Sequence, residues 1–346
     1  MKILIRIPNW LGDAIMATYA LEMLFANFKN AHFYLVGSKV STALFAHYPN
    51  ITTLEDTSKK GGFRILNLYK LAKKIPPCTL AFTFQNNFLS ALFLCFNGAK
   101  LRSGFSTEMR SFLLHFHPKK PKTMHEAMRF ANLVQQTLLL KLQTPFKQVP
   151  QILHLRTQNT QVELPQTFKD SKIIGINAGA AFGAAKRWEE AYFAEVIAHF
   201  LKQNYKIILF GVESENPINL AILSHLKPTQ NVLNLSGQTT IPQLIAYFSH
   251  LNFLLTNDSG PMHLAVALKI PTLALFGPTN AQETSPFNAS FAQIISLETL
   301  GQKLACMPCM QRTCPLPTTS KDYHACMQNL TPELVICAMQ SLLKEQ

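Results

Sequence analysis

The stretch LLTNDSGPMHLAVAL, residues 254–268, has the pattern of a buried strand that turns directly into a helix. The apolar run ends at Asp258, Ser259-Gly260 turns the chain, and Pro261 suits the first turn of a helix. The first backbone N–H groups of a helix have no partner within it, and the helix dipole favours negative charge there. The turn therefore predicts a phosphate-binding site, beside which Asp258 could accept hydrogen bonds from sugar hydroxyls.

The same residues also suit a purely structural interpretation. Aspartate and serine are common N-caps, so Asp258 and Ser259 could serve only to begin the helix. His263 could then be an ordinary first-turn histidine. The local sequence leaves both interpretations open, and the neighbouring motifs favour the binding site.

Two further loops follow predicted strands in the same half of the chain. INAGAAFGAAKRW, residues 176–188, has small residues that leave room for a ligand beside the backbone, followed by Lys186 and Arg187. LFGPTNAQETSP, residues 275–286, places Thr279 in a third turn. Neither loop has the Walker or the dinucleotide-binding pattern, which argues against an ATPase or an NAD-dependent enzyme. Taken singly, the cations could be solvated charges and the turn an ordinary one.

Short apolar runs alternate with helical periodicity along the chain, which is the βαβ rhythm of parallel sheets. The strands predicted in the first half are KILIRI, AHFYLVG and CTLAFTF, and those in the second half are KIIGINA, KIILFG, VLNLSG, LNFLLTND and PTLALFG. The polar segment 155–171 has neither period and predicts a linker. Two such domains in series would bind ligands at the carboxyl ends of their strands, around a shared cleft.

Composition and charge are consistent with this organisation. A chain of 346 residues, 48% hydrophobic and 15% charged, can bury a large core and divides most naturally into two domains. Its net charge of +13 favours anionic partners. Arg6 and Pro8 interrupt what would have to be a signal core, which predicts a cytoplasmic protein. The apolar run at 88–96 is too short to span a bilayer and predicts a core helix.

The cysteines near the carboxyl terminus allow two interpretations. Cys306, Cys309, Cys314 and Cys326 begin with a C-x-x-C pair that could open a zinc site. The later intervals are irregular for a zinc module, and a chain without a secretory signal keeps its thiols reduced. We therefore expect structural thiols and no metal, with a zinc site as the alternative.

Together, NDSGPMHLA, AGAAFGAAKRW, LFGPTN and the amino-terminal IPNWLGDAIMA resemble the motifs of the bacterial ADP-heptose:lipopolysaccharide heptosyltransferases, in the same order and over nearly the whole chain. FGAAKRW and PNWLGDA resemble the type II enzymes, which add the second inner-core heptose. The resemblance implies a GT-B fold of two Rossmann-like domains facing across a cleft. Residues 1–165 would bind the acceptor, residues 170–330 would bind ADP-heptose, and residues 331–346 would form a helix that packs back on the first domain.

The resemblance also implies the reaction. Heptose would move from ADP-L-glycero-β-D-manno-heptose to the first heptose of the lipopolysaccharide inner core, with inversion and by direct displacement. Asp13 would be the general base that takes the proton of the acceptor hydroxyl. Lys186 and the amides around Ser259-Gly260 would stabilise the departing ADP, so that neither a cofactor nor a metal is needed.

Residue by residue, the motifs imply a donor site and an acceptor site. Asp258 would bind heptose hydroxyls, Ser259 and Gly260 the pyrophosphate, Thr279 the neighbouring phosphate or sugar, and Glu215 the adenosine ribose. Glu213 lies two residues away, and either glutamate could be only a helix-start carboxylate. The remaining donor-site candidates are Gly179, Arg187 and His263. The acceptor candidates are Asn9, Trp10, Arg64, Arg110, Lys119, Lys120 and Arg129, of which the basic ones could also form a solvated face.

Other functions remain open. The runner-up within the family is a heptosyltransferase I acting on Kdo-lipid A. A non-catalytic nucleotide-sugar binding protein would keep the second-half motifs but have no use for Asp13. A nucleic-acid binding protein would explain the charge, but the sequence has no recognition-helix, stacking or zinc-finger signature. A phosphorylated glycolipid on the cytoplasmic face of the inner membrane explains the charge equally well, so we expect peripheral membrane contact and no nucleic acid.

Overall fold

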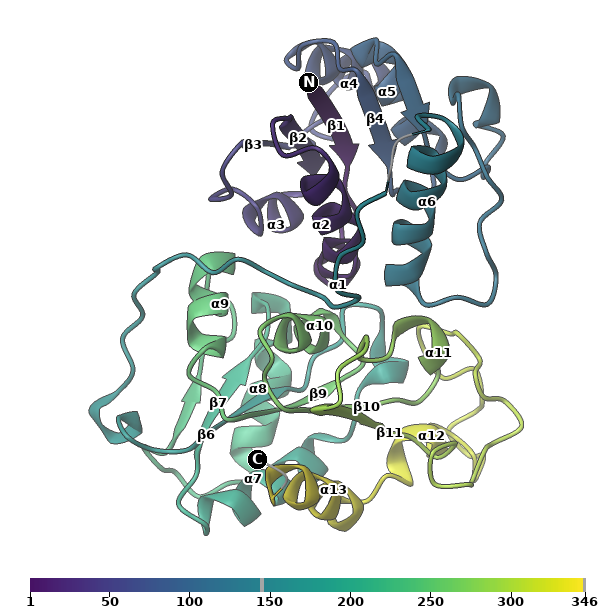
Figure 1. Ribbon diagram of the computed structural model, residues 1–346. Coiled ribbons are helices and arrows are strands. Elements are labelled where there is room, and N and C mark those ends of the chain that lie inside the picture. The colour runs from purple at the N-terminus through teal and green to yellow at the C-terminus, as the bar shows by residue number, and fades with distance from the viewer. Residues whose placement is uncertain (144–145, 345–346) are drawn as a thin grey trace. The chain divides into compact units, whose positions relative to one another are not determined.

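The computed structural model describes residues 1–143 and 146–344, and the chain forms two compact units, Met1–Gln158 and Asn159–Gln346 (Figure 1). The division falls inside the polar segment 155–171, which the sequence predicts as a linker. Each unit has its own parallel sheet and its own core.

The first unit is an α/β domain. Its strands are β1 (Lys2–Arg6), β2 (His32–Gly37), β3 (Ile51–Glu55), β4 (Leu80–Thr83) and β5 (Leu101–Ser103). Its helices are α1 (Leu11–Met16), α2 (Thr18–Asn27), α3 (Lys39–Ala43), α4 (Arg64–Lys73), α5 (Phe88–Asn97), the 3₁₀ turn η1 (Ser111–Leu113) and α6 (Glu126–Leu140).

The first sheet has the strand order β3-β2-β1-β4-β5, with every pair parallel. Strand β1 lies in the middle and is buried from Ile3 onward, as expected for an apolar strand covered on both faces. From β1 the chain adds β2 and β3 on one side of the sheet, and then returns to add β4 and β5 on the other side. The switch point of the sheet therefore lies between β1 and β4. Ligands of such sheets bind at the carboxyl ends beside this switch point.

The second unit repeats the architecture. Its strands are β6 (Ile173–Asn177), β7 (Lys206–Phe210), β8 (Val232–Asn234), β9 (Phe253–Asn257), β10 (Thr272–Leu275) and β11 (Ala292–Ile295). Its helices are η2 (Gln166–Phe168), η3 (Ala184–Lys186), α7 (Glu190–Leu201), η4 (Glu213–Glu215), α8 (Asn216–Ser224), α9 (Ile241–Phe248), α10 (Gly260–Ala267), α11 (Ala281–Thr284), α12 (Ala325–Gln328) and α13 (Pro332–Lys344).

The second sheet has the order β11-β10-β9-β6-β7-β8, again parallel throughout. Its switch point lies between β6 and β9, both buried along their full length. The loops that follow these two strands carry the motifs at 176–188 and 254–268. The fold thus brings together two motifs that are far apart in the sequence.

Helix α13 forms where the sequence predicts a closing helix. It packs on α7 within the second unit. Val335, Met339 and Leu342 are buried in the same core cluster as Phe193 and Val196 of α7. The helical period shows that α13 has an apolar face and carries no information about which surface covers it.

The apolar run at 88–96 forms α5, which buries Ala91, Phe93 and Leu94 in the core of the first unit. Within residues 1–143 and 146–344, no helix is both long enough and apolar enough to cross a membrane.

Candidate active site

Three side chains from separate loops meet at the switch point of the second sheet. The ammonium of Lys186, on the loop after β6, lies 2.5 Å from Oδ2 of Asp258, which follows β9. The hydroxyl of Thr279, after β10, donates to the same oxygen at 2.6 Å. The lysine and aspartate side chains are 11% and 5% exposed. The three motifs that the sequence indicates one by one therefore form one polar cluster.

Two asparagines hold the loops of this cluster in place. Asn257 ends β9, where its Nδ2 donates to the carbonyl of Ala178 at 2.7 Å and its Oδ1 accepts from the backbone N–H of Trp188. Asn177 ends β6 and donates to Oγ of Ser259 at 3.1 Å. The sequence interpretation missed both residues. An amide side chain at the carboxyl end of a mostly apolar strand is the signal that could have identified them.

The geometry at Asp258 and Ser259 does not support the interpretation that they only cap a helix. Ser259 occupies the N-cap position of α10, but its hydroxyl makes no capping bond and instead bonds Asn177 and lies 3.1 Å from Oγ1 of Thr256. The Asp258 carboxylate is bound by Lys186 and Thr279. Helix α10 begins at Gly260, so its first amides lie next to the polar cluster.

The remaining donor-site candidates belong to the same unit. Glu215 is 8% exposed, and its carboxylate packs against Gly179, where a Cβ atom would collide with it. Its Oε2 accepts from the backbone N–H of Val212 at 3.0 Å, so it also acts as a helix-start carboxylate, whereas Glu213 is exposed. Arg187 is half-buried directly after η3, and His263 is buried in the first turn of α10, 3% exposed.

In the first unit, the loop after β1 carries Asn9 and Trp10 at the corresponding switch point, and the first turn of α1 carries Asp13. Gln85, which follows β4, donates to the carbonyl of Ile7 at 2.7 Å and to Oδ1 of Asn9 at 3.2 Å. Trp10 is 58% exposed and is the N-cap of α1, without a side-chain capping bond. Asp13 is half-buried in the first helical turn, so it is not the N-cap of this helix.

A buried ion pair lies at the end of β1, directly before this loop, and the sequence interpretation missed it. Nη2 of Arg6 lies 2.6 Å from Oδ2 of Asp56, with side chains only 4% and 9% exposed, and the guanidinium stacks over Phe93. Burial would raise the pKa of Asp56, but the charge of Arg6 and hydrogen bonds from Ser58 outweigh it and lower that pKa. A cation inside an apolar strand is the signal that could have indicated this pair.

Two of the predicted acceptor residues are corrected. Arg110 is 0% exposed and donates to the carbonyls of Phe105 and Gln85, among others, so its guanidinium binds the protein's own loops. Arg129 is 4% exposed and pairs with Glu126 at 2.6 Å. Counting basic residues cannot distinguish a buried arginine that satisfies backbone carbonyls from one that faces solvent.

The other basic acceptor candidates are less buried than these two arginines. Lys120 also reaches Glu126, at 3.3 Å. Arg64 and Lys119 are exposed and remain available to an anionic ligand.

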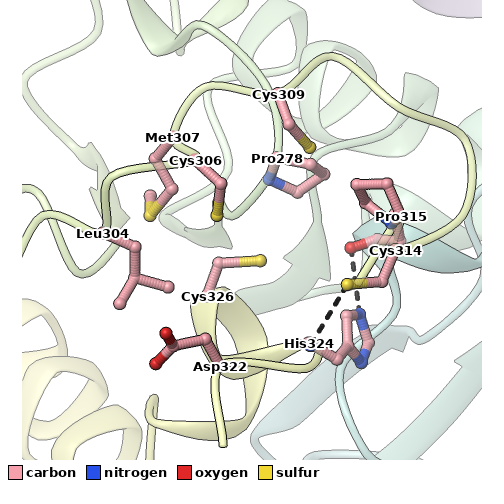
Figure 2. A pocket seen from close by; sticks show the side chains of 11 residues that line it. Pro278, Leu304, Cys306, Met307, Cys309, Cys314, Pro315, Asp322, His324 and Cys326 are labelled. Carbon is pink, nitrogen blue, oxygen red and sulfur yellow. Dashed lines mark hydrogen bonds between the residues drawn. The ribbon is translucent and has the colours of Figure 1, made fainter. Parts of the chain in front are cut away.

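The four clustered cysteines lie around one pocket beside the polar cluster (Figure 2). Figure 2 shows the sulfur atoms of Cys306, Cys309, Cys314 and Cys326 pointing toward the same space, and all four are free thiols. Burial, with smaller contributions from the other three cysteines, raises the pKa of Cys326 to about 12. In the part of the chain that the structure describes, no three His, Cys, Asp or Glu side chains are placed to hold a metal ion.

The segment 306–326, which contains the four cysteines, contacts the loops of the candidate site. The carbonyl of Arg312 accepts from the backbone N–H of Ala185 at 3.0 Å, and a Cβ atom at Gly183 would collide with the same carbonyl. A ring nitrogen of His324 lies 3.1 Å from the carbonyl of Ala185. The backbone N–H of Met310 donates to the carbonyl of Pro278. These contacts fix the segments next to Lys186 and Thr279.

Comparisons with known proteins agree with this geometry. The model of glycosyltransferase family 9 (heptosyltransferase) matches residues 68–319. Lipooligosaccharide heptosyltransferase 2 of Campylobacter jejuni is 38% identical over 345 residues, covering 99% of both chains. Lipopolysaccharide heptosyltransferase 2 of Escherichia coli is 27% identical, covering 100% of this chain and 99% of its own.

The solved structure of E. coli ADP-heptose lps heptosyltransferase II aligns over 100% of this chain and 99% of its own, with a TM-score of 0.77 and 25% identity. Two parallel α/β units with this likeness identify the fold as GT-B. The chain is therefore a member of glycosyltransferase family 9, the heptosyltransferases.

Proposed function

We propose that this enzyme transfers heptose from ADP-L-glycero-β-D-manno-heptose to the first heptose of the lipopolysaccharide inner core. The relatives with the widest coverage are named heptosyltransferase 2, which supports the second-heptose reaction over the first. The observation that carries the proposal is the meeting of Lys186, Asp258 and Thr279 beside the first turn of α10.

The donor fits this cluster chemically. An ammonium has three N–H donors, so Lys186 can hold Asp258 and a phosphate oxygen at the same time. The amides that begin α10 at Gly260 are suited to the other oxygens of the pyrophosphate. Asp258, with acceptor oxygens only, would take hydrogen bonds from the heptose hydroxyls. Glu215 would bind the adenosine ribose.

The reaction that we propose is a direct displacement with inversion. Asp13 takes the proton from the acceptor hydroxyl as that oxygen attacks the anomeric carbon, and the bond between this carbon and the ADP oxygen breaks. Lys186 and the α10 amides stabilise the negative charge that develops on ADP. These groups supply both the base and the charge stabilisation, so the mechanism uses no metal and no cofactor.

The acceptor is a phosphorylated, lipid-linked sugar in this proposal. The exposed residues Asn9, Trp10, Arg64 and Lys119 of the first unit would contact it. Such an acceptor places the enzyme at the cytoplasmic face of the inner membrane, in peripheral contact with it.

A transfer assay with purified enzyme, ADP-heptose and two acceptors tests the proposal. One acceptor ends in Kdo and the other in the first heptose. We expect transfer only to the heptose-terminated acceptor. Transfer only to the Kdo-terminated acceptor would identify a heptosyltransferase I, and ADP-heptose binding without transfer to either acceptor would contradict the enzymatic proposal.

A further inference from the structure

Helix α4 and the residue before it expose a continuous group of large apolar side chains. Phe63 is 83% exposed, Ile65 56%, Leu66 48% and Tyr69 44%. Single exposed apolar residues are common on protein surfaces, but four within two helical turns are not explained in that way.

The orientation of this apolar face is fixed by the opposite face of the helix. Leu68, Leu71 and Ala72 are buried in the core cluster of the first unit. Rotating α4 to cover the exposed side chains would remove these three from the core. The exposed face is therefore a stable feature of the fold.

Positive charge surrounds the apolar side chains. Residues 57–77 contain six basic residues and neither aspartate nor glutamate, and all six are exposed: Lys59, Lys60, Arg64, Lys70, Lys73 and Lys74. Lys60 reaches Glu55 outside this segment at 3.1 Å. The ammonium of Lys73 lies 5.3 Å from the ring centre of Tyr69, so apolar and cationic groups share one surface.

The apolar side chains of α4 also contact α5. The rings of Tyr69 and Phe96 of α5 are in edge contact, with centres 5.3 Å apart. We call Phe63, Ile65, Leu66 and Tyr69, together with the six basic residues, the α4 surface.

We propose that the α4 surface docks the enzyme on an anionic phospholipid bilayer, with Phe63 and Leu66 at the boundary between headgroups and acyl chains and the lysines on lipid phosphates. Helices that lie in a membrane interface combine aromatic and leucine side chains with lysine and arginine in this way. The core of a protein–protein interface is instead depleted in lysine. Docking would bring the enzyme to a lipid-linked acceptor, and only this benefit rests on the proposed function.

Vesicle flotation with the full-length protein tests the inference. The vesicles are phosphatidylcholine alone, or phosphatidylcholine with phosphatidylglycerol, each at low and high salt. We expect binding to the anionic vesicles that weakens as salt rises. Equal binding to both vesicle types, or none to either, would overturn the inference.

Paired variants locate the binding surface. Phe63→Ser with Leu66→Ser, and separately Lys70→Glu with Lys73→Glu, should each lower vesicle binding by about tenfold or more. Leu220→Ser with Lys227→Glu makes the same kinds of change at exposed positions of the second unit and should bind as the wild type does. Wild-type vesicle binding by both α4 variants would overturn the inference. The same result is expected if this surface binds another protein and not a bilayer.

Activity separates this inference from the proposed function. Both α4 variants should transfer heptose normally to a deacylated, water-soluble acceptor and poorly to an acceptor embedded in vesicles. Normal transfer to the embedded acceptor would contradict a docking role. A wild-type enzyme that binds anionic vesicles through α4 but transfers no heptose would refute the proposed function and leave the docking surface intact.

Discussion

Lys186 and Asp258 are buried together, so each stabilises the charge of the other. Removing one partner of a buried pair usually costs about 3–5 kcal/mol of stability, because the remaining charge is left uncompensated. The free energies of unfolding of the single variants therefore report the pair as well as the ligand site. Nucleotide binding must be measured under conditions in which the variants are folded.

Lys186→Ala should weaken ADP binding by about 1.5–3 kcal/mol, since it removes a charged hydrogen-bond donor facing the pyrophosphate. Isothermal titration calorimetry measures this change. Lys303→Ala is the matched control, because Lys303 is an exposed lysine of the same unit, paired with Glu298. An unchanged dissociation constant for Lys186→Ala would show that the lysine serves the fold alone.

Asp56 should make the stability of the first unit sensitive to acid. Its pKa is lowered in the folded state, so its contribution is complete above the unfolded pKa of about 4 and is lost as pH falls through the folded value. The wild type should lose stability below about pH 4. Asp56→Asn should have a lower free energy of unfolding than the wild type at neutral pH, and this free energy should fall less steeply as the pH is lowered.

Urea unfolding at a series of pH values checks the acid dependence. Asp170→Asn, a change of an exposed aspartate, serves as the control and should follow the wild-type curve. Parallel curves for Asp56→Asn and the wild type would contradict the role assigned to the Arg6–Asp56 pair.

The sequence identifies the chemistry of single residues better than their surroundings. Lys186, Asp258 and Thr279 are each indicated by their own motif, but their shared hydrogen bonds depend on a sheet order that no local pattern contains. The same limit explains the errors at Arg110 and Arg129, since burial of a cation depends on distant carbonyl and carboxylate partners.

Among the strands and helices, burial decides what can be predicted. The fully buried central strands β1, β4, β6 and β9 appear in the sequence as apolar runs. Of the four edge strands, the sequence predicts β8 and does not predict β3, β5 and β11, which are mostly half-buried. Their residues lack a continuous apolar run, and pairing with a neighbouring strand makes them strands.

Helix α13 should stabilise the second unit through its buried face. Met339→Ala removes a fully buried side chain and should lower the free energy of unfolding by about 2–5 kcal/mol. Leu334→Ala, on the same helix but 38% exposed, should cost much less. Equal losses for the two variants in urea unfolding would contradict the packing of α13 on α7.

The two units divide the proposed reaction between them. The phosphate-adapted loops belong to the second unit, whereas Asp13 and the exposed acceptor candidates belong to the first. The alternation of strands and helices predicts both parallel sheets, and the resemblance to known heptosyltransferases implies the GT-B fold, which the solved relative confirms. The roles of the individual site residues stay predictions, because each role depends on a bound substrate.

The turnover number of Asp13→Asn tests the central claim most directly. Asparagine keeps the size of the side chain but cannot accept the proton, so the turnover number should fall by about 10²–10⁴. ADP affinity should stay at the wild-type value, and stability should change by no more than about 1 kcal/mol, because Asp13 is a first-turn carboxylate and not the N-cap of α1. A nearly fully active Asp13→Asn enzyme would contradict the mechanism.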